Sequence, residues 1–314
     1  MVNSEKSHIY CRDGKDVFGS ELLRIGKASE GINLPDIVRF DYKNRSSIGY
    51  MKYDKNIFNN NSLEFVLHQL LREIQIDSAK TLRVYNDASC KKPVAILSID
   101  VTDGTDYEFV NFRQMRDELF FDFKNKIIPE TKWIKDWMTI RNRRTNKDLW
   151  ELRAQMHSDY VNCIKFPFEI AGLWCDKHKM YLNQFSESIS KMLTFDILIG
   201  QADRSPSNYG LLVDNVNHRA KMAPLFDNAT ITKPYIDLYQ NSFNQLLLDR
   251  EKLALAADDV LGSDFRIAVS QMLDSKPRII AIIKRYKSNL EKDNYDLLKS
   301  RVEEGMLIFE KLLR

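Results

Sequence analysis

The first hundred positions carry their apolar residues mostly in short runs typical of β-strands. Residues 37–53 are rich in Ile, Val, Phe and Tyr and are interrupted by polar turn formers at 43–46, which predicts a β-hairpin. Two further apolar runs, TLRVY at 81–85 and PVAILSIDV at 93–101, flank the turn-like segment NDASCKK. These two runs predict two more strands.

One segment of this region has the spacing of a helix instead. In SLEFVLHQLLREI, residues 62–74, the large aliphatic side chains recur every three or four positions, so they lie on one face of an amphipathic helix. We therefore expect residues 1–101 to form one domain in which strands wrap around a single long helix.

Beyond the TDGTD segment at 102–106, the pattern changes to longer runs with a helical period. Such runs occur at residues 149–164, 186–200, 277–290 and 294–313. They predict an α-rich second domain over residues 102–314.

A short β-pattern interrupts this helical region. The apolar runs GLLVD, 210–214, and MAPLF, 222–226, flank the polar tip DNVNHR, which predicts a β-hairpin. Asp203 and Asn208 precede this hairpin, and Asp227 follows it. Because a hairpin brings its outer ends together, we expect the oxygen atoms of these three side chains to converge.

Converging side-chain oxygens without His or Cys suit a hard cation, above all Mg²⁺. The order Asp, Asn five residues later, β-hairpin and Asp is the order in which kinases carry a catalytic base and two metal ligands. A kinase also needs a strand lysine for the phosphates of ATP and a helix glutamate that holds this lysine. Lys52 in the predicted hairpin and Glu64 in the following helix are the candidates.

These residues also have simpler interpretations. Asp203 and Asp227 are of a type common in turns and caps, and Glu64, three residues after Asn61, fits a capping pair at a helix start. Arg204 either steadies a phosphate or pairs with an acid. The sequence leaves these alternatives open.

The composition excludes several classes of protein. Of the 314 residues, 44% are hydrophobic and 29% are charged, as in globular proteins with a real core, which excludes disorder as the main theme. A formal net charge of +3 is too small to indicate nucleic-acid binding, and the basic run at 141–147 is best explained as a solvated helix face. The pair Cys175 and His178 lacks the second ligand pair that a zinc site requires.

Cysteine usage and hydropathy indicate the compartment. Four cysteines without a C-x-x-C pair indicate free thiols in a reducing environment. We find neither the apolar stretch of a signal peptide nor a run long enough to span a membrane. The sequence therefore predicts a cytoplasmic protein, and export by a route other than Sec stays open.

With these residues assembled, the sequence resembles the HipA-like serine/threonine kinases, in particular their compact CtkA-type members. The stretch MLTFDILIGQADRSPSNYGLLVD resembles the family's F-D-x-L-I-G-N-x-D-R-H-x-x-N-x-G, and MAPLFDNAT resembles its L-A-P-x-F-D-N-G. Nearer the N-terminus, GYMKYD resembles a Y-M-x-K-F strand and LEFVLHQLL an S-E-Y helix start. Gln201, Ser205 and Ala229 depart from the family's Asn, His and Gly.

The resemblance implies a role for each matched residue. It makes Asp203 the catalytic base, Asn208 and Asp227 the metal ligands, Lys52 the phosphate-binding lysine and Glu64 its ion-pair partner.

The chain has no clear Gly-rich phosphate loop, and two segments are candidates for one. The segment GKASEG at 26–31 is one, but KNRSSIG at 43–49 is favoured because it lies beside the strand of Lys52 and offers the amides of Ser46, Ser47 and Gly49 to phosphate. The resemblance further implies autophosphorylation of Ser46 or Ser47.

The implied fold is a two-lobed α+β, protein-kinase-like fold. Its small β-rich N-lobe with one long helix spans 1–101, and its larger α-rich C-lobe with the metal-binding hairpin spans 102–314. The implied activity is ATP- and Mg²⁺-dependent transfer of the γ-phosphoryl group to a Ser or Thr hydroxyl of a protein. The alternatives are a small-molecule phosphotransferase and a nucleotide-binding pseudokinase. The resemblance also implies a toxin or effector role, with an antitoxin or host protein as neutralising partner.

Overall fold

The structure is a computed structural model that describes most of the chain. The described residues are 6–13, 16–27, 35–53, 61–90, 93–124, 160–201, 204, 206–228 and 249–314. The chain divides into two compact units. The first unit comprises Met1–Asp106, Pro224–Ala229 and Arg278–Tyr295, and the second comprises Tyr107–Ala223, Thr230–Pro277 and Asp296–Arg314. The short segment that carries Asp227 thus belongs to the first unit.

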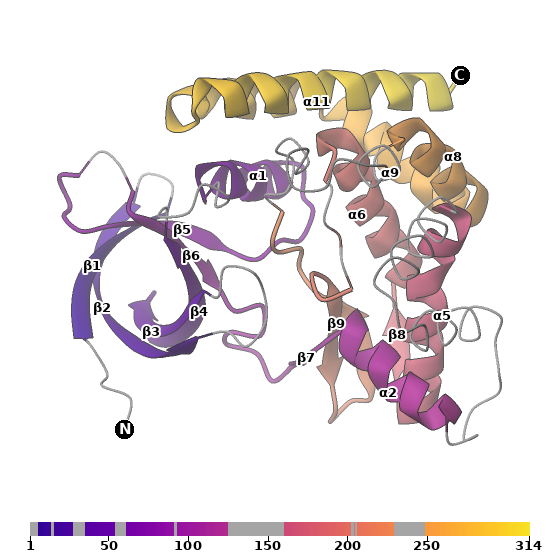
Figure 1. Ribbon diagram of the computed structural model, residues 1–314, viewed down its shortest axis with the longest axis horizontal. Coiled ribbons are helices and arrows are strands. Elements are labelled where there is room, and N and C mark those ends of the chain that lie inside the picture. The colour runs from indigo at the N-terminus through magenta and orange to yellow at the C-terminus, as the bar shows by residue number, and fades with distance from the viewer. Residues whose placement is uncertain are drawn as a thin grey trace, which may run out of the picture. The chain divides into compact units, whose positions relative to one another are not determined.

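Six strands of the first unit close into a β-barrel (Figure 1). They are β1 (Lys6–Asp13), β2 (Asp16–Lys27), β3 (Asp36–Tyr42), β4 (Arg45–Tyr53), β5 (Thr81–Tyr85) and β6 (Ala95–Ile99). Their order is β1-β2-β3-β4-β6-β5, every pair is antiparallel, and the pairing of β1 with β5 closes the ring.

The hairpin of β3 and β4 confirms the prediction for residues 37–53. Its turn consists of Lys43 and Asn44, whose φ angles are 50° and 64°. Two central residues with positive φ form the tight turn that matches the twist of the two strands. Ser46, Ser47 and Gly49 consequently lie within β4, after the turn.

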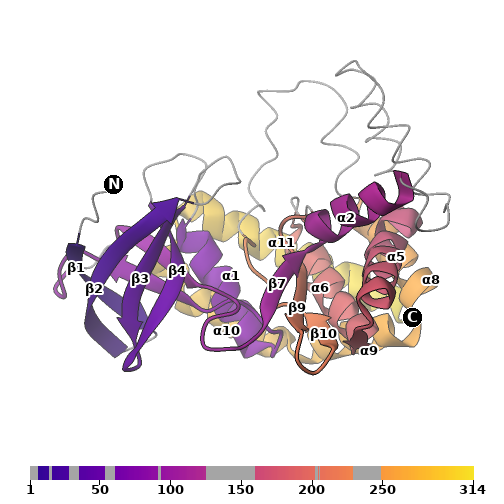
Figure 2. The ribbon, with the colours of Figure 1, turned by 90° about the horizontal axis from the view of Figure 1, so that it is seen from below.

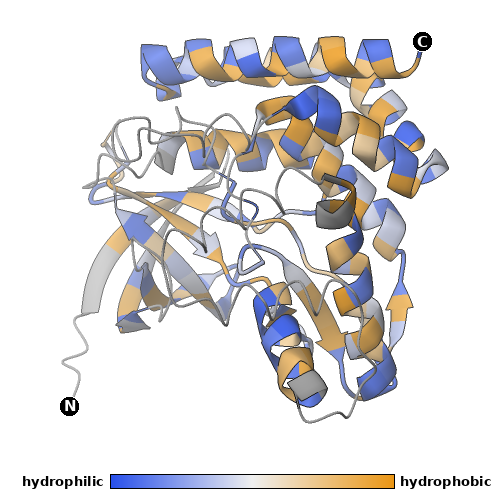
Figure 3. Cartoon of the chain, turned by 45° about the vertical axis from the view of Figure 1, so that its right-hand side comes forward, coloured by the Kyte–Doolittle hydropathy of each residue, from blue (hydrophilic) through white to orange (hydrophobic). Residues whose placement is uncertain are grey.

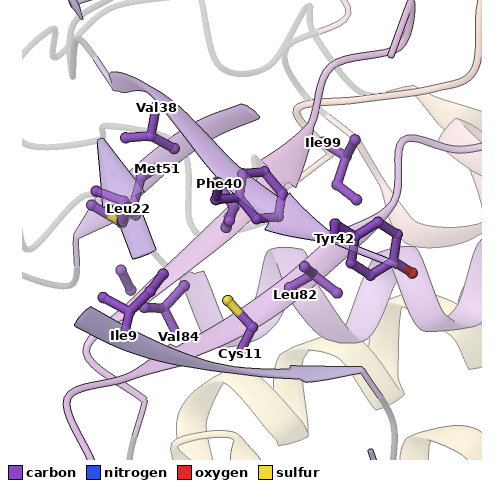
Figure 4. Packing of buried hydrophobic residues seen from close by; sticks show 12 residues of the cluster. Ile9, Cys11, Leu22, Val38, Phe40, Tyr42, Met51, Leu82, Val84 and Ile99 are labelled. Atoms are coloured by element: carbon purple, nitrogen blue, oxygen red, sulfur yellow. The ribbon is translucent and has the colours of Figure 1, made fainter. Parts of the chain in front are cut away.

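The barrel encloses its own hydrophobic core (Figure 4). Alternate strand residues point inward, as the period of a β-strand requires. The buried cluster contains Ile9, Cys11, Leu22, Val38, Phe40, Tyr42, Met51, Leu82, Val84, Ala95, Leu97 and Ile99. Burial raises the pKa of the Cys11 thiol to about 12, so this cysteine acts as an apolar core residue.

The single helix of the predicted N-lobe is present, but the strands do not wrap around it. Helix α1 (Asn61–Glu73) packs outside the barrel against β5 and β6. The expected arrangement was wrong because the inward side chains of the strands fill the barrel themselves. The sequence pattern also missed β1 and β2.

Two C-terminal elements contribute to the first unit as well. Part of helix α10 (Lys276–Arg285) and the 3₁₀ turn η1 (Lys287–Asn289) belong to it. The ring of Tyr286, which links them, meets Phe65 of α1 edge to face, with centroids 5.7 Å apart. Aromatic pairs favour this geometry, so α1 is held in part by residues far away in sequence.

The second unit contains a four-stranded sheet and most of the helices. Figure 2 shows β7, β9 and β10 as neighbours, and the full order is β7-β9-β10-β8. The strands are β7 (Glu108–Asn111), β8 (Tyr181–Asn183), β9 (Gly210–Asp214) and β10 (Arg219–Met222). The helices are α2 (Phe112–Lys124), α5 (Tyr160–His178), α6 (Phe185–Ile199), α8 (Arg250–Leu261), α9 (Ser263–Asp274) and α11 (Lys292–Leu312), of which α11 begins within the first unit.

Most of the helical run predicted at 149–164 lies outside the described residues, and the other predicted runs are largely present. Helix α6 covers the run at 186–200 and α11 covers that at 294–313. Figure 3 shows apolar and polar residues alternating around the helix that ends at the C-terminus, α11. No helix in the described ranges is both long and apolar enough to cross a membrane.

The hairpin of the second unit has a different second strand from the predicted one. Strand β10 consists of RAKM, Arg219–Met222, and not of MAPLF. Ala223 still donates a hydrogen bond to the carbonyl of Gly210, but Pro224 follows and has no N–H with which to continue the ladder. The chain therefore leaves the sheet before it reaches Asp227.

Helix α6 is packed closely in the second unit. Gly305 of α11 lies against its last turn, where an added Cβ would come within 2.7 Å of the Cα of Leu198. From α8, the guanidinium of Arg250 donates to the carbonyls of Ile197 and Leu198 at 3.1 and 3.3 Å. These contacts fix the point at which the chain leaves α6 toward Asn208.

Candidate functional site

The first unit brings together three of the residues predicted from the sequence. The Nζ of Lys52 lies 2.9 Å from each oxygen of Glu64 and 3.1 Å from Oδ1 of Asp227. One ammonium group thus bridges two carboxylates from segments that are far apart in the chain.

The local structure explains why Lys52 and Glu64 meet. Along β4, Ser47, Gly49 and Met51 are buried in the barrel, so Lys52 lies on the opposite, outer face of the strand. Helix α1 packs on that side of the barrel wall, at β5 and β6, and presents Glu64 from its first turn. The two oxygens of Glu64 accept hydrogen bonds from Lys52, which favours the ion-pair interpretation over the capping one.

Burial gives this pair its electrostatic character. The Glu64 side chain is 4% exposed and the Lys52 side chain 17% exposed. Burial alone lowers the pKa of Lys52, but the negative charges of Glu64 and Asp227 outweigh it and hold that pKa above its ordinary value. Burial also raises the pKa of the Glu64 carboxyl, and the charge of Lys52 opposes this shift. Lys52 therefore remains a positively charged group.

A short β-bridge places Asp227 beside Lys52. Leu225 donates its N–H to the carbonyl of Asp77 and accepts a hydrogen bond from the N–H of Ala79, each at 2.8 Å, next to the parallel bridge between Ser78 and Leu225. Asp77–Ala79 follow α1, so the bridge ties the Asp227 segment to the first unit. The sequence analysis missed this bridge.

The backbone of Asp227 has an unusual conformation. Its φ angle is 53°, in the left-handed region that residues with a Cβ rarely adopt. Such strain often occurs at functional sites, where the surrounding structure imposes it. Here Asp227 follows the β-bridge at Leu225 and precedes the fully buried Asn228, while its own side chain is 44% exposed.

The proposed nucleotide-loop residues form part of a tight hairpin. Ser46 is exposed, whereas Ser47 is fully buried in the barrel. Gly49 lies close to the neighbouring strand, since a Cβ at this position would come within 2.8 Å of the Ser98 carbonyl oxygen. Of the two serines, Ser46 is therefore the one whose hydroxyl faces solvent.

A second polar network next to Lys52 was missed by the sequence analysis. The hydroxyl of Tyr50 donates to Asp100 at 3.0 Å, and burial together with the Asp100 charge raises the pKa of Tyr50 to about 12. Asp103 binds Arg45 at 2.8 Å. These two acids fasten residues 100–103, which follow β6, to β4.

In the second unit, Arg204 forms an ion pair. Its Nε and Nη2 donate to the two oxygens of Asp196 at 2.9 and 2.7 Å. Of the two alternatives for Arg204, the structure therefore shows pairing with an acid. Asn208 is half-buried four residues later. Asp203 and the basic run at 141–147 lie outside the described residues.

The Cys175 and His178 pair has a structural explanation. His178 Nε2 lies 2.8 Å from Glu118, and Glu118 also accepts a hydrogen bond from the indole of Trp174. Burial raises the pKa of Cys175 to about 11. Within the described part of the chain, no group of three or more His, Cys, Asp or Glu side chains is placed to hold a metal ion.

Comparison with solved structures identifies the fold. The proinflammatory kinase CtkA from Helicobacter pylori is similar over 98% of this chain and 96% of its own, with a TM-score of 0.51 and 14% sequence identity. HipA from Shewanella oneidensis MR-1, solved in a toxin–antitoxin complex with HipB and operator DNA, is also 14% identical. It matches over 92% of this chain and 63% of its own, with a TM-score of 0.45.

Sequence comparisons add no further relative. No family model matches the chain, and no curated protein is similar enough to be matched. The chain therefore has a mixed α and β fold like that of CtkA, and at 14% identity this likeness concerns the fold alone.

Proposed function

We propose that this protein is a kinase that uses ATP and Mg²⁺ to phosphorylate a Ser or Thr hydroxyl of a protein. The observation that carries the proposal is the bridging of Glu64 and Asp227 by the Lys52 ammonium. The fold shared with CtkA supports it. Kinases need a lysine held by a helix glutamate, next to an acid that binds metal.

In this proposal, Lys52 binds phosphate oxygens of ATP. Its raised pKa keeps it charged, and its two bonds to Glu64 hold the ammonium in place. A fixed positive charge stabilises the negative charge that accumulates on the phosphates during transfer. Glu64 acts as the positioning residue for Lys52.

The proposed phosphoryl transfer forms one phosphorus–oxygen bond and breaks another. The acceptor hydroxyl oxygen forms a bond to the γ-phosphorus, the bond between that phosphorus and the β,γ-bridging oxygen breaks, and ADP leaves. Asp203 accepts the hydroxyl proton, in the role predicted from the sequence.

The residue types that the sequence predicts as metal ligands suit a magnesium ion. Asp227 and Asn208 offer oxygen donors, which Mg²⁺ prefers, and the Asp227 carboxylate is partly exposed beside Lys52. Bound Mg²⁺ would neutralise charge on the phosphates of ATP. Asp227 and Asn208 are the residues that would hold it.

The proposal is tested by incubating the protein with γ-labelled ATP and Mg²⁺, with and without a generic Ser/Thr acceptor protein. We expect label on protein for the wild type and a loss of at least about 100-fold for Lys52→Met, Asp203→Ala and Asp227→Ala. Lys299→Met, which removes an exposed lysine of α11, is the matched control and keeps full activity. Thermal melting verifies that each variant is folded.

Other results of this assay would either indicate a competing function or refute the proposed site. Nucleotide binding without transfer would indicate the pseudokinase, and label on a metabolite but not on protein would indicate the small-molecule phosphotransferase. Equal labelling of the wild type and all three site variants would refute the site. The toxin or effector role and the neutralising partner stay predictions that follow from the sequence resemblance.

Autophosphorylation of the hairpin is a separate prediction that mass spectrometry can check. Because Ser47 is buried and Ser46 is exposed, phosphate on the folded protein is expected on Ser46. Ser46→Ala then removes the modification from the peptide that contains β4, while Ser47→Ala keeps it.

A further inference from the structure

The segment that connects α6 to β9 is anchored where it begins. Gly200 ends α6 in the left-handed conformation, with φ 69°, and donates its N–H to the carbonyl of Asp196. Gln201 donates to the same carbonyl at 2.9 Å. A left-handed glycine cap of this kind fixes the direction in which the chain leaves a helix.

A buried ion pair anchors the same segment further along. The guanidinium of Arg204 forks onto both carboxylate oxygens of Asp196, and its Nη1 lies 3.5 Å from the carbonyl oxygen of Asn208. The Arg204 and Asp196 side chains are only 10% and 5% exposed. One guanidinium thus connects the end of α6 to the residue that the sequence predicts as a metal ligand.

The free-energy cost of burying charges indicates that the pair of Arg204 and Asp196 does more than stabilise the fold. Burying two opposite charges costs desolvation that their attraction barely offsets, so apolar residues of similar size are commonly as stable or more stable. The planar guanidinium instead provides a defined geometry, because two parallel hydrogen bonds fix both its distance from the carboxylate and its orientation.

The helix end that receives the fork is itself immobilised. Arg250 donates to carbonyls of the last turn of α6 and, at 2.8 Å, to the carbonyl of Arg301 in α11. Its other nitrogen pairs with Glu304, and Gly305 packs against Leu198. Because this end of α6 is held firmly, a guanidinium bound to it can determine the position of the segment between α6 and β9.

We infer that Arg204 and Asp196 are positioning residues that hold Asn208, in the segment between α6 and β9, in the geometry that the kinase reaction requires. This inference rests on the proposed function and specifies how Asn208 is held. The Arg204 guanidinium is directed to Asp196, and phosphate binding is left to Lys52.

The second unit offers a matched control pair. Arg266 of α9 forks onto Asp258 of α8 at 2.7 and 2.8 Å, but the Arg266 side chain is 58% exposed. The two pairs have the same chemistry and nearly the same distances, and they differ in burial and in attachment to the loop. The variants to compare are Arg204→Lys and Asp196→Asn with Arg266→Lys and Asp258→Asn.

Steady-state kinetics give the first readout. For Arg204→Lys and Asp196→Asn we expect kcat to fall about 10- to 100-fold, as a displaced group commonly causes, with the KM for ATP within about twofold. The Mg²⁺ concentration at half-maximal rate should rise several-fold. The two control variants should keep wild-type values.

Hydrogen exchange gives a second readout that needs no activity. Amides in the peptide that spans 200–210 should exchange faster in Arg204→Lys and Asp196→Asn, while those of the barrel keep wild-type rates. Arg204→Lys retains the charge and loses only the fork, so it covers the case in which Asp196→Asn fails to fold.

Three results would overturn the inference. In the first, KM for ATP rises for Arg204→Lys while Asp196→Asn behaves as wild type, which makes Arg204 a phosphate ligand. In the second, both variants keep wild-type kcat and Mg²⁺ dependence. In the third, hydrogen exchange at 200–210 is unchanged in both variants. This result counts against the inference whether or not the wild type has kinase activity, so it is independent of a failure of the proposed function.

Discussion

The two units each contain a buried cation that pairs with a carboxylate, and the two pairs differ in what the cation does. In the first unit, the Lys52 ammonium contacts both Glu64 and Asp227. In the second, the Arg204 guanidinium forks onto Asp196. Among the described contacts, the first cation is shared between Glu64 and Asp227, which come from different segments, and the second binds Asp196 with two parallel bonds.

The difference between the two cations indicates which of them is suited to bind a ligand such as phosphate. An ammonium is a compact point charge with three donors in no fixed plane, so it can contact several acceptors at once. A guanidinium is a rigid planar fork that matches a single carboxylate. This contrast fits the proposed function, in which Lys52 binds phosphate and Arg204 positions Asn208, and three further experiments examine it.

Removal of Glu64 should have the largest effect on stability. Glu64→Ala leaves Lys52 buried without its main partner, and breaking a buried pair in this way costs about 3 kcal/mol of the free energy of unfolding. Urea denaturation measures this loss, and the kinase assay should show reduced activity. Glu303→Ala, which removes an exposed glutamate of α11, should change stability by less than about 0.5 kcal/mol.

Glu64→Gln separates the charge of Glu64 from its shape. The amide oxygen still accepts a hydrogen bond from Lys52, so the loss of stability should be smaller than for Glu64→Ala. A Glu64→Ala variant as stable as the wild type would show that Lys52 does not depend on its buried partner.

A substitution behind α6 tests the rigidity of the support in the second unit. Gly305→Ala places a methyl group within 2.7 Å of the Leu198 backbone, and overpacking of this kind costs about 2 kcal/mol. Because Leu198 lies two residues after Asp196, the kinase rate should fall as well. Thermal or urea unfolding measures the first effect.

The matched control is Gly172→Ala in α5, where an added Cβ meets nothing within 4 Å. Replacing a helical glycine by alanine at such a site should stabilise the protein by about 0.5 kcal/mol. Equal behaviour of the two variants would contradict the close approach of α11 to α6.

Alkaline titration should show the smallest effect and distinguishes the two cations directly. The pKa of Lys52 is raised in the folded protein above the ordinary lysine value of 10.5. Its contribution to stability is therefore complete below pH 10.5 and is lost as the pH rises through the higher folded pKa. Arg204 stays charged over this range and contributes no such slope.

The measurement compares urea unfolding of the wild type and Lys52→Met between about pH 9 and pH 12. The difference in unfolding free energy between the two proteins should shrink as the pH increases, whereas that between wild type and Arg204→Met should stay constant. A constant difference for Lys52→Met as well would argue against the raised pKa.

Local patterns predicted much of this molecule. Helix α1, helix α6 and the β3–β4 hairpin follow from apolar spacing and turn residues that lie close together in sequence. The predicted contact of Lys52 with Glu64 is present, because strand alternation and the helix start determine where each side chain points. The roles of Asp203, Asn208 and Asp227 stay predictions.

Non-local features were the ones that the sequence did not predict. Closure of the barrel depends on pairing between β1 and β5. Backbone hydrogen bonds of this kind can form between many residue types, so the sequence pattern does not reveal which strands pair. For the same reason, the bridge from Leu225 to Ser78 was not expected. The end of β10 at Met222 had a residue-type signal, Pro224, which the sequence analysis overlooked.

The sequence by itself determined which side chains could do chemistry, since residue type and local period depend only on near neighbours. Tertiary structure alone decided their partners. It placed Asp227 on Lys52 through a β-bridge, and it directed Arg204 to Asp196. The physical reason is that burial makes a charge depend on its neighbours in space, and those neighbours come from segments brought together only by folding.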